Sequence, residues 1–144
     1  MSYEISKVDV WAGPIQDRPG GLADTLEKLE AAGANLEFVV ARRAPEQPGT
    51  GVVFVAPLSG AKQTRAAVQA GMAKADTMHS LRLEGPDKPG LGARITRVLA
   101  DAGINLRGLS AAALGRRCVV YFAFDTAADA GKASRLAKKL LAGK

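Results

Sequence analysis

The chain has 144 residues, of which 47% are hydrophobic and 24% charged, and its formal net charge is +6. This is the composition of an ordinary globular protein, and no apolar run approaches the roughly 18 residues that a membrane-spanning helix needs. The single cysteine excludes an intrachain disulfide, and the N-terminus lacks the basic and apolar regions of a secretory signal, so we expect a cytoplasmic protein without membrane contact.

The first half of the chain predicts a β-α-β-β-α order. Its elements are a strand over 8–12, a helix from Pro19 to the Gly33 C-cap, strands over 35–43 and 52–56, and a helix over about 61–75. Gly13-Pro14 is expected to end the first strand. In the second helix, Val68 and Met72 are expected to face inward.

The second half restarts the same order. Its predicted elements are a strand over 80–84, a helical apolar stripe over 91–102, strands over 106–114 and 118–124, and a last helix capped by Asp125 or Thr126. The helix that ends near Ala75 leaves no room for a fourth strand before Ser80, and the chain stops at Lys144. Both halves are therefore expected to lack a closing strand, which leaves the edge of each first strand open.

Two motifs recur 70 residues apart. Asp-Arg-Pro-Gly-Gly-Leu over 17–22 corresponds to Asp-Lys-Pro-Gly-Leu-Gly over 87–92, and Ala-Gly-Ala-Asn-Leu over 32–36 corresponds to Ala-Gly-Ile-Asn-Leu over 102–106. A shared turn, helix length and exit turn indicate a tandem duplication. We therefore predict two units, residues 1–76 and 77–144, packed about a pseudo-twofold axis.

The excess positive charge lies entirely in the second half. Residues 1–75 hold eight basic and eight acidic residues, whereas residues 76–144 hold twelve and six. A nucleic-acid binder would gather such charge in one stripe, but here it is spread over strands, turns and the last helix. We interpret it as solvated helix faces, with nucleic-acid binding as the alternative.

The third strand of each unit, over 52–56 and 118–124, is apolar on both faces. Helices can cover only one face of a sheet, and leaving Val or Phe side chains wet is costly, so we predict a homodimer. The open edges of strands 8–12 and 80–84 are expected to pair, giving one six-stranded sheet. Pairing through the second strands is the alternative.

The order β-α-β-β-α, with Asp-x-Pro-Gly between the first strand and first helix, resembles the ACT domain, twice over nearly the whole chain. The resemblance implies an α+β fold of two ferredoxin-like units, each with an antiparallel sheet and helices on one face. It also implies a small regulatory module that binds an amino acid or a similar ligand where two such domains meet. Ile15-Gln16 is inserted before Asp17, and Gly21 stands where the family usually has Leu.

A Pro-Gly turn that opens a helix presents backbone N–H groups at the positive end of the helix dipole, which suits a carboxylate. The predicted ligand residues are Asp87, Pro89, Gly90, Leu91 and Asn105, with Asp17, Gly20, Gly21 and Asn35 as the weaker copy. The Asn amides can both donate and accept hydrogen bonds. The alternative is structural: the two Asp residues cap their helices, and the two Asn residues stabilise the turns that follow.

Catalytic chemistry has little support. The lone His79 precedes a strand, Cys118 lies in an apolar strand, and no Cys/His cluster or phosphate-binding glycine loop occurs, so we predict no enzyme activity, metal or cofactor. Trp11 and Tyr121 are interpreted as core residues rather than base-stacking ones. We favour an amino-acid sensor. The alternatives are a module that regulates an amino-acid-metabolism enzyme without its own ligand, and a ferredoxin-like nucleic-acid binder.

Overall fold

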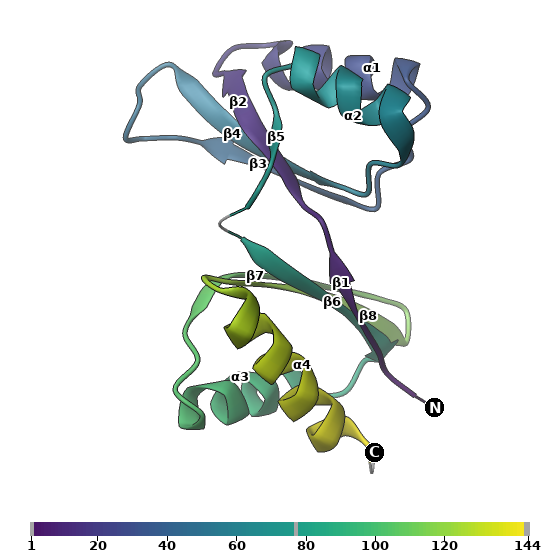
Figure 1. Ribbon diagram of the computed structural model, residues 1–144, viewed down its shortest axis with the longest axis vertical. Helices are drawn as coiled ribbons and strands as arrows, with labels where there is room; N and C mark the ends of the chain where they lie inside the picture. The colour runs from purple at the N-terminus through teal and green to yellow at the C-terminus, as the bar shows by residue number, and fades with distance from the viewer. Residues whose placement is uncertain (1, 77, 143–144) are drawn as a thin grey trace. The chain divides into compact units, whose positions relative to one another are not determined.

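The computed structural model describes residues 2–76 and 78–142. It divides into two compact units. The first-repeat unit runs from Asp9 to Ala75, and the second-repeat unit combines the residues up to Val8 with those from Asp76 onward. Each unit has a four-stranded antiparallel sheet with two helices on one face (Figure 1). The predicted α+β, ferredoxin-like fold is confirmed.

The first-repeat unit follows a β-α-β-β-α-β order. Its elements are β2 (Trp11–Gln16), α1 (Gly21–Ala31), β3 (Phe38–Arg43), β4 (Thr50–Ala56), α2 (Gly60–Gln69) and β5 (Ala73–Lys74). The strands lie in the order β3-β4-β2-β5. Leu29, Val53, Val55, Ala67 and Met72 form the buried core between sheet and helices.

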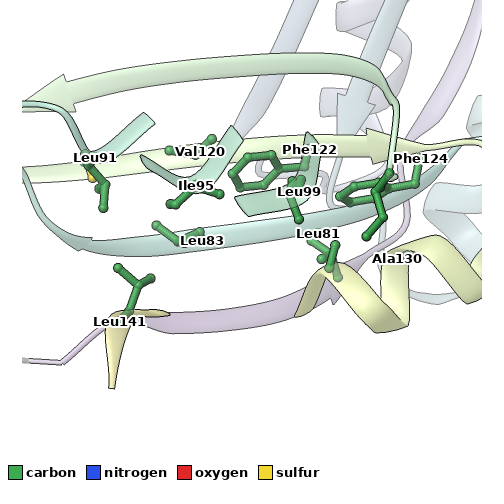
Figure 2. Packing of buried hydrophobic residues seen from close by; sticks show 13 residues of the cluster. Leu81, Leu83, Leu91, Ile95, Leu99, Val120, Phe122, Phe124, Ala130 and Leu141 are labelled. Atoms are coloured by element: carbon green, nitrogen blue, oxygen red, sulfur yellow. The ribbon is translucent and has the colours of Figure 1, made fainter. Parts of the chain in front are cut away.

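The second-repeat unit has the same arrangement, with one strand taken from the start of the chain. Its elements are β6 (His79–Pro86), α3 (Leu91–Asp101), β7 (Leu106–Leu114), β8 (Arg117–Phe124) and α4 (Ala127–Leu141), together with β1 (Glu4–Val8). The strands lie in the order β1-β6-β8-β7. Figure 2 shows its larger core, in which side chains of α3 and α4 gather over β6 and β8.

The prediction that each unit lacks its closing strand is wrong. Helix α2 ends at Gln69, and Gly71 turns the chain with a φ of 84°, so that β5 pairs antiparallel with β2. In the second-repeat unit, β1 fills the same place and pairs antiparallel with β6, with Ile5 opposite Leu83. The shorter α2 leaves room for β5 before β6, and β1 comes from the start of the chain and not from a segment after α4.

The predicted single strand over 8–12 is also wrong, because the chain changes sheet within it. β1 ends at Val8, opposite Ser80, and β2 begins at Trp11 in the other sheet. The expected pairing of strand 8–12 with strand 80–84 is wrong as well: the strand that pairs with β6 is β1, which shares only Val8 with the predicted strand, and it completes a four-stranded sheet instead of building one six-stranded sheet. The structural division therefore differs from the predicted units 1–76 and 77–144 at the N-terminus.

Both Gly-Pro steps lie inside strands, although the first was expected to end one. Pro14 sits opposite Val52 in β2, and Pro86 sits opposite Arg117 in β6. Proline cannot donate to a neighbouring strand, so it is tolerated where one side of the strand has no partner. The neighbours β5 and β1 supply that condition, because their pairing stops at Ala12 and Glu84.

Two predictions about buried faces change. Val68 is 62% exposed, and Ala67 takes the inward position of α2, because the helix is shorter than predicted and its phase differs. On β8, the face away from the helices is not left wet: Tyr121 and Ala123 are both buried within the chain. The argument for a homodimer from an uncovered apolar strand therefore does not apply to β8, and the homodimer stays a prediction.

Candidate ligand site

The two Pro-Gly turns have the same backbone geometry. In each, the glycine adopts a left-handed conformation, with a φ of 89° at Gly20 and 82° at Gly90. The residue after each glycine donates its N–H to the carbonyl three residues back, at 3.0 Å from Gly21 and 3.2 Å from Leu91. These are type II turns, in which proline presets the first angle and glycine accepts the second without a Cβ clash.

The first Pro-Gly turn is closed by its own neighbours. A Cβ on Gly21 would lie 2.1 Å from the Gln16 carbonyl oxygen, so only glycine fits this position. Arg18 folds back over the turn, donating to the Pro19 carbonyl at 2.9 Å and pairing with Asp24 at 2.8 Å. The Gln16 carbonyl therefore takes the place that the Leu91 side chain fills in the second repeat, and the Arg18 side chain lies over the turn.

The second Pro-Gly turn is open. Ideal Cβ atoms built at Gly90 and at Gly92 meet no atom within 4 Å. Leu91, which replaces Gly21, is 4% exposed because its side chain enters the core below the helix (Figure 2). An incoming group can therefore reach the helix N-terminus here without displacing any part of the chain.

The donors available at this opening differ from those predicted. The Leu91 N–H is used inside the turn, so it does not face a ligand. The first turn of any helix also leaves the next N–H groups without intrahelical partners, and in α3 these belong to Gly92 and Ala93. The predicted ligand residues include Gly90 and Leu91 but leave out Gly92, although the Pro-Gly-Leu-Gly pattern already places a second small residue at the opening.

Neither Asp side chain caps its helix, so the capping alternative is wrong for both turns. Asp17 instead accepts a hydrogen bond from Arg43 at 2.9 Å. Asp87 is exposed, and its backbone N–H donates to the Arg116 carbonyl at 2.8 Å, which ties the turn to the β7–β8 hairpin. Asp87 therefore directly precedes the open turn, with an exposed side chain.

The two asparagines lie away from the Pro-Gly turns. Asn35 and Asn105 are both exposed, just beyond the C-terminal ends of α1 and α3. Helix α3 has 11 residues, so it holds Gly90 and Asn105 about 16 Å or more apart. A single amino acid inside one unit therefore cannot contact both.

The end of β6 that leads to the open turn is covered by Tyr3 and lies next to the buried Cys118. Tyr3 covers Gly85, and its hydroxyl donates to the Pro86 carbonyl at 2.8 Å. Cys118 lies 3.7 Å from the same carbonyl oxygen. Burial raises the pKa of the Cys118 thiol, and the negative charge of Asp87 raises that pKa further, which keeps the thiol protonated.

The remaining candidates from the sequence form no reactive cluster. His79 begins β6 opposite Phe124, away from Cys118, which pairs at the other end of the strand with Gly85. Within residues 2–76 and 78–142, no group of three His, Cys, Asp or Glu side chains is placed to hold a metal ion. None of the described helices is both long and apolar enough to cross a membrane.

Residues 79–142 match the family model of the ACT domain. This segment is an ACT domain. It coincides with the second repeat, which carries the open turn, and it confirms the resemblance for that half of the chain. The tandem of two ACT units stays a prediction, since the match does not extend over the first repeat. No curated protein matches the sequence.

Solved structures share the fold along nearly the whole chain. A protein from Bacteroides thetaiotaomicron aligns with a TM-score of 0.77 and 14% identity, covering 94% of this chain and 89% of that one. The regulatory subunit of aspartate kinase from Thermus thermophilus has a TM-score of 0.65 and 15% identity, covering 96% of both chains. The corresponding subunit from Thermus flavus has 0.61 and 16%, again covering 96% of both. At these identities the likeness concerns the fold alone.

Proposed function

We propose that this protein is a non-catalytic regulatory protein, built from two ACT units, that binds an amino acid or a similar small carboxylate at the second Pro-Gly turn. The observation that carries the proposal is the open N-terminus of α3, where neither Gly90 nor Gly92 has an atom near its Cβ position. Backbone N–H groups and the helix dipole together favour a carboxylate there.

An amino acid also needs a partner for its ammonium group. Asp87 supplies a carboxylate beside the turn that is exposed and is not used as a helix cap. The zwitterion would place its carboxylate on the Gly92 and Ala93 N–H groups and its ammonium on Asp87. Arg94, in the same helix turn, adds positive charge on the carboxylate side.

The separation between the open turn and Asn105 bears on assembly. If Asn105 contributes to recognition, it must come from another unit, because its own turn lies at the far end of α3. We therefore propose that the complete site forms where two ACT units meet between the copies of a homodimer. Gly20, Gly21 and Asn35 form no second site in this proposal, because the first Pro-Gly turn is covered.

The solved neighbours named as regulatory subunits of aspartate kinase support a regulatory role. We propose that the chain passes its ligand signal to a metabolic enzyme. The cytoplasmic location stays a prediction.

Calorimetric titration with each of the twenty amino acids tests the ligand. The blocking variant is Gly92→Leu, because position 92 has an ordinary helical backbone, whereas Gly90 holds a left-handed angle that a side chain would strain. The Leu side chain would cover the N–H groups, so binding should fall at least about tenfold, the effect of about 1.4 kcal/mol. Asp87→Asn should weaken amino acids more than it weakens simple carboxylates.

The matched control is Gly131→Leu, which adds the same side chain to α4, away from the turn. It should leave affinity unchanged. If no amino acid binds wild type below millimolar concentration, or if Gly92→Leu binds equally well, the site is wrong. The ligand-free regulatory module then becomes the better account.

A further inference from the structure

Helices α1 and α3 occupy equivalent places in the two units. Gly21, Thr25 and Leu29 are the buried positions of α1, and residues exactly 70 further on, Leu91, Ile95 and Leu99, are those of α3. The helices therefore present equivalent residues on their outer faces as well. The two outer faces therefore differ only in the side chains that they carry at equivalent positions.

The outer faces carry opposite charges at matching positions. Asp24 corresponds to Arg94, and Glu27 corresponds to Arg97. Each face also carries alanine at the equivalent positions 23 and 93. Small residues on both faces let two helices approach closely, and charges of opposite sign on either side would then pair.

The basic face of α3 borders a groove. The groove has a volume of about 770 Å³ and is lined by Ala93, Arg94, Thr96, Arg97, Val98 and Ala100 of α3 with Leu140 of α4. Its lining is mainly apolar, with the two arginines as its charged groups. Arg97 makes only a long contact of 3.8 Å with Asp101, and both side chains are largely exposed, so this arginine is available to another acid.

The acidic face of α1 carries exposed carboxylates that could pair with a second copy. Asp24 is paired with Arg18, but Glu27 and Glu30 are exposed and form no ion pair in the part of the chain that the structure describes. Helix α1 holds three acidic residues and one basic residue, whereas α3 and α4 together hold six basic and two acidic residues. The complement of the groove is thus present in the same sequence.

We propose that copies of this chain associate by docking α1 of one copy into the α3–α4 groove of a second copy. Glu27 and Arg97 lie next to the midpoints of their 11-residue helices. Residues near both midpoints face each other whether the helices run parallel or antiparallel, so this pair lies at the centre of the contact. Reciprocal docking gives a closed dimer, and one-way docking gives a chain of copies.

Charge reversal tests the contact directly. Glu27→Lys and Arg97→Glu each place like charges at the centre and should each weaken association by about tenfold or more, measured by analytical ultracentrifugation. The variant that carries both changes restores an opposite pair at every contact and should recover wild-type association. Raising the salt concentration should weaken the association of the wild type, because salt screens its charged pairs, but it should not weaken the apolar part of the contact.

The matched control is Arg65→Glu, which makes the same charge reversal on an exposed position of α2, outside the groove. Circular dichroism checks that every variant is folded. A wild type that stays monomeric at submillimolar concentration overturns the proposal. So does an oligomer that neither single reversal weakens, because another surface would then hold it. The test needs no amino acid, so its failure is separate from failure of the proposed ligand site.

Discussion

The two Pro-Gly turns share one backbone path and differ in what lies above the helix. At the first, the Arg18 side chain lies over the turn, 3.2 Å from the Cβ position of Gly20. At the second, no atom lies within 4 Å of the Cβ positions of Gly90 and Gly92. A duplicated motif has therefore produced one covered and one accessible helix N-terminus.

The difference arises from exchanges that depend on one another. In the first repeat the Gln16 carbonyl lies at the Cβ position of residue 21, so that position must be glycine. In the second repeat the equivalent Leu91 side chain fills this place and enters the core. A backbone carbonyl and an apolar side chain thus take the same place beneath the two turns, and the Arg18 side chain is what lies over the first turn.

The largest effect is expected when the anchor below the second Pro-Gly turn is removed. Leu91 is 4% exposed among the core side chains, so Leu91→Ala should leave a cavity and lower the free energy of unfolding by about 2–5 kcal/mol. Urea denaturation followed by circular dichroism measures the loss. Leu22→Ala, at a half-buried position of α1, is the control and should cost less. A loss below about 1 kcal/mol for Leu91→Ala would contradict the anchoring role.

A smaller loss is expected when the covered turn is crowded. The added methyl of Gly21→Ala would meet the Gln16 carbonyl at 2.1 Å, so the backbone must move, at a cost of about 1–3 kcal/mol. Gly92→Ala is the paired control, because its methyl meets no atom within 4 Å. It should be neutral or slightly stabilising, since alanine favours helix. Equal stabilities of the two variants in the same denaturation experiment would remove the distinction between the turns.

Much of the fold was predictable, because periodicity reports which face of an element is buried. The stripe Leu91, Ile95 and Leu99 was recognised, and it is the buried face of α3. Thr126 was one of two predicted caps for the last helix, and it accepts a hydrogen bond from the Asp129 N–H at 3.0 Å. β1 and β5 were missed. β5 has only two residues, and β1 pairs with a strand more than 70 positions away, so neither has a local pattern.

The kind of candidate site could be predicted from the sequence, but not which residues lie together in it. The Pro-Gly motif identified the turns, and that the first of them is the weaker ligand site stays a prediction. Sequence spacing could not show that the Leu91 N–H closes the turn, because this depends on the backbone angles of Gly90. It also could not show that Asn105 lies at the opposite end of α3 from the turn.

A still smaller effect is expected for the side chain over the first turn. Arg18 and Asp24 are each about half exposed, at 50% and 54%, so Arg18→Ala should cost less than about 1 kcal/mol. Leu22 remains in this variant at the position where the second repeat has the open Gly92. Arg18→Ala should therefore gain no ligand site, and calorimetry should give the same stoichiometry as wild type. A second bound amino acid would mean that Arg18 alone closes the turn. Lys88→Ala, at the equivalent position, is the control.

The smallest effect concerns an ion triad in the strand that leads to the open turn. Glu84 accepts a hydrogen bond from Arg82 at 2.8 Å and another from Arg117 at 3.3 Å. The hydrogen bond from Arg82, with its positive charge, holds the pKa of Glu84 below its ordinary value of 4.5, and Arg117 lowers it further. The carboxylate therefore stabilises the fold above about pH 4.5, and this contribution is lost as the pH falls through the lowered pKa.

Glu84→Gln removes this dependence, so its stability should fall less steeply than that of wild type as the pH is lowered from 6 toward 3, a range set around the carboxyl pKa. The difference should be small, because the Glu84 side chain is 33% exposed and solvent screens the pair. Urea denaturation at several pH values measures it. Glu46→Gln is the control, because Glu46 is exposed and makes no ion pair within the described residues. If Glu84→Gln and wild type lose stability in parallel as the pH falls, the triad does not stabilise the strand that leads to the open turn. The contacts that fix this turn are then the buried Leu91 side chain and the backbone hydrogen bond of Asp87.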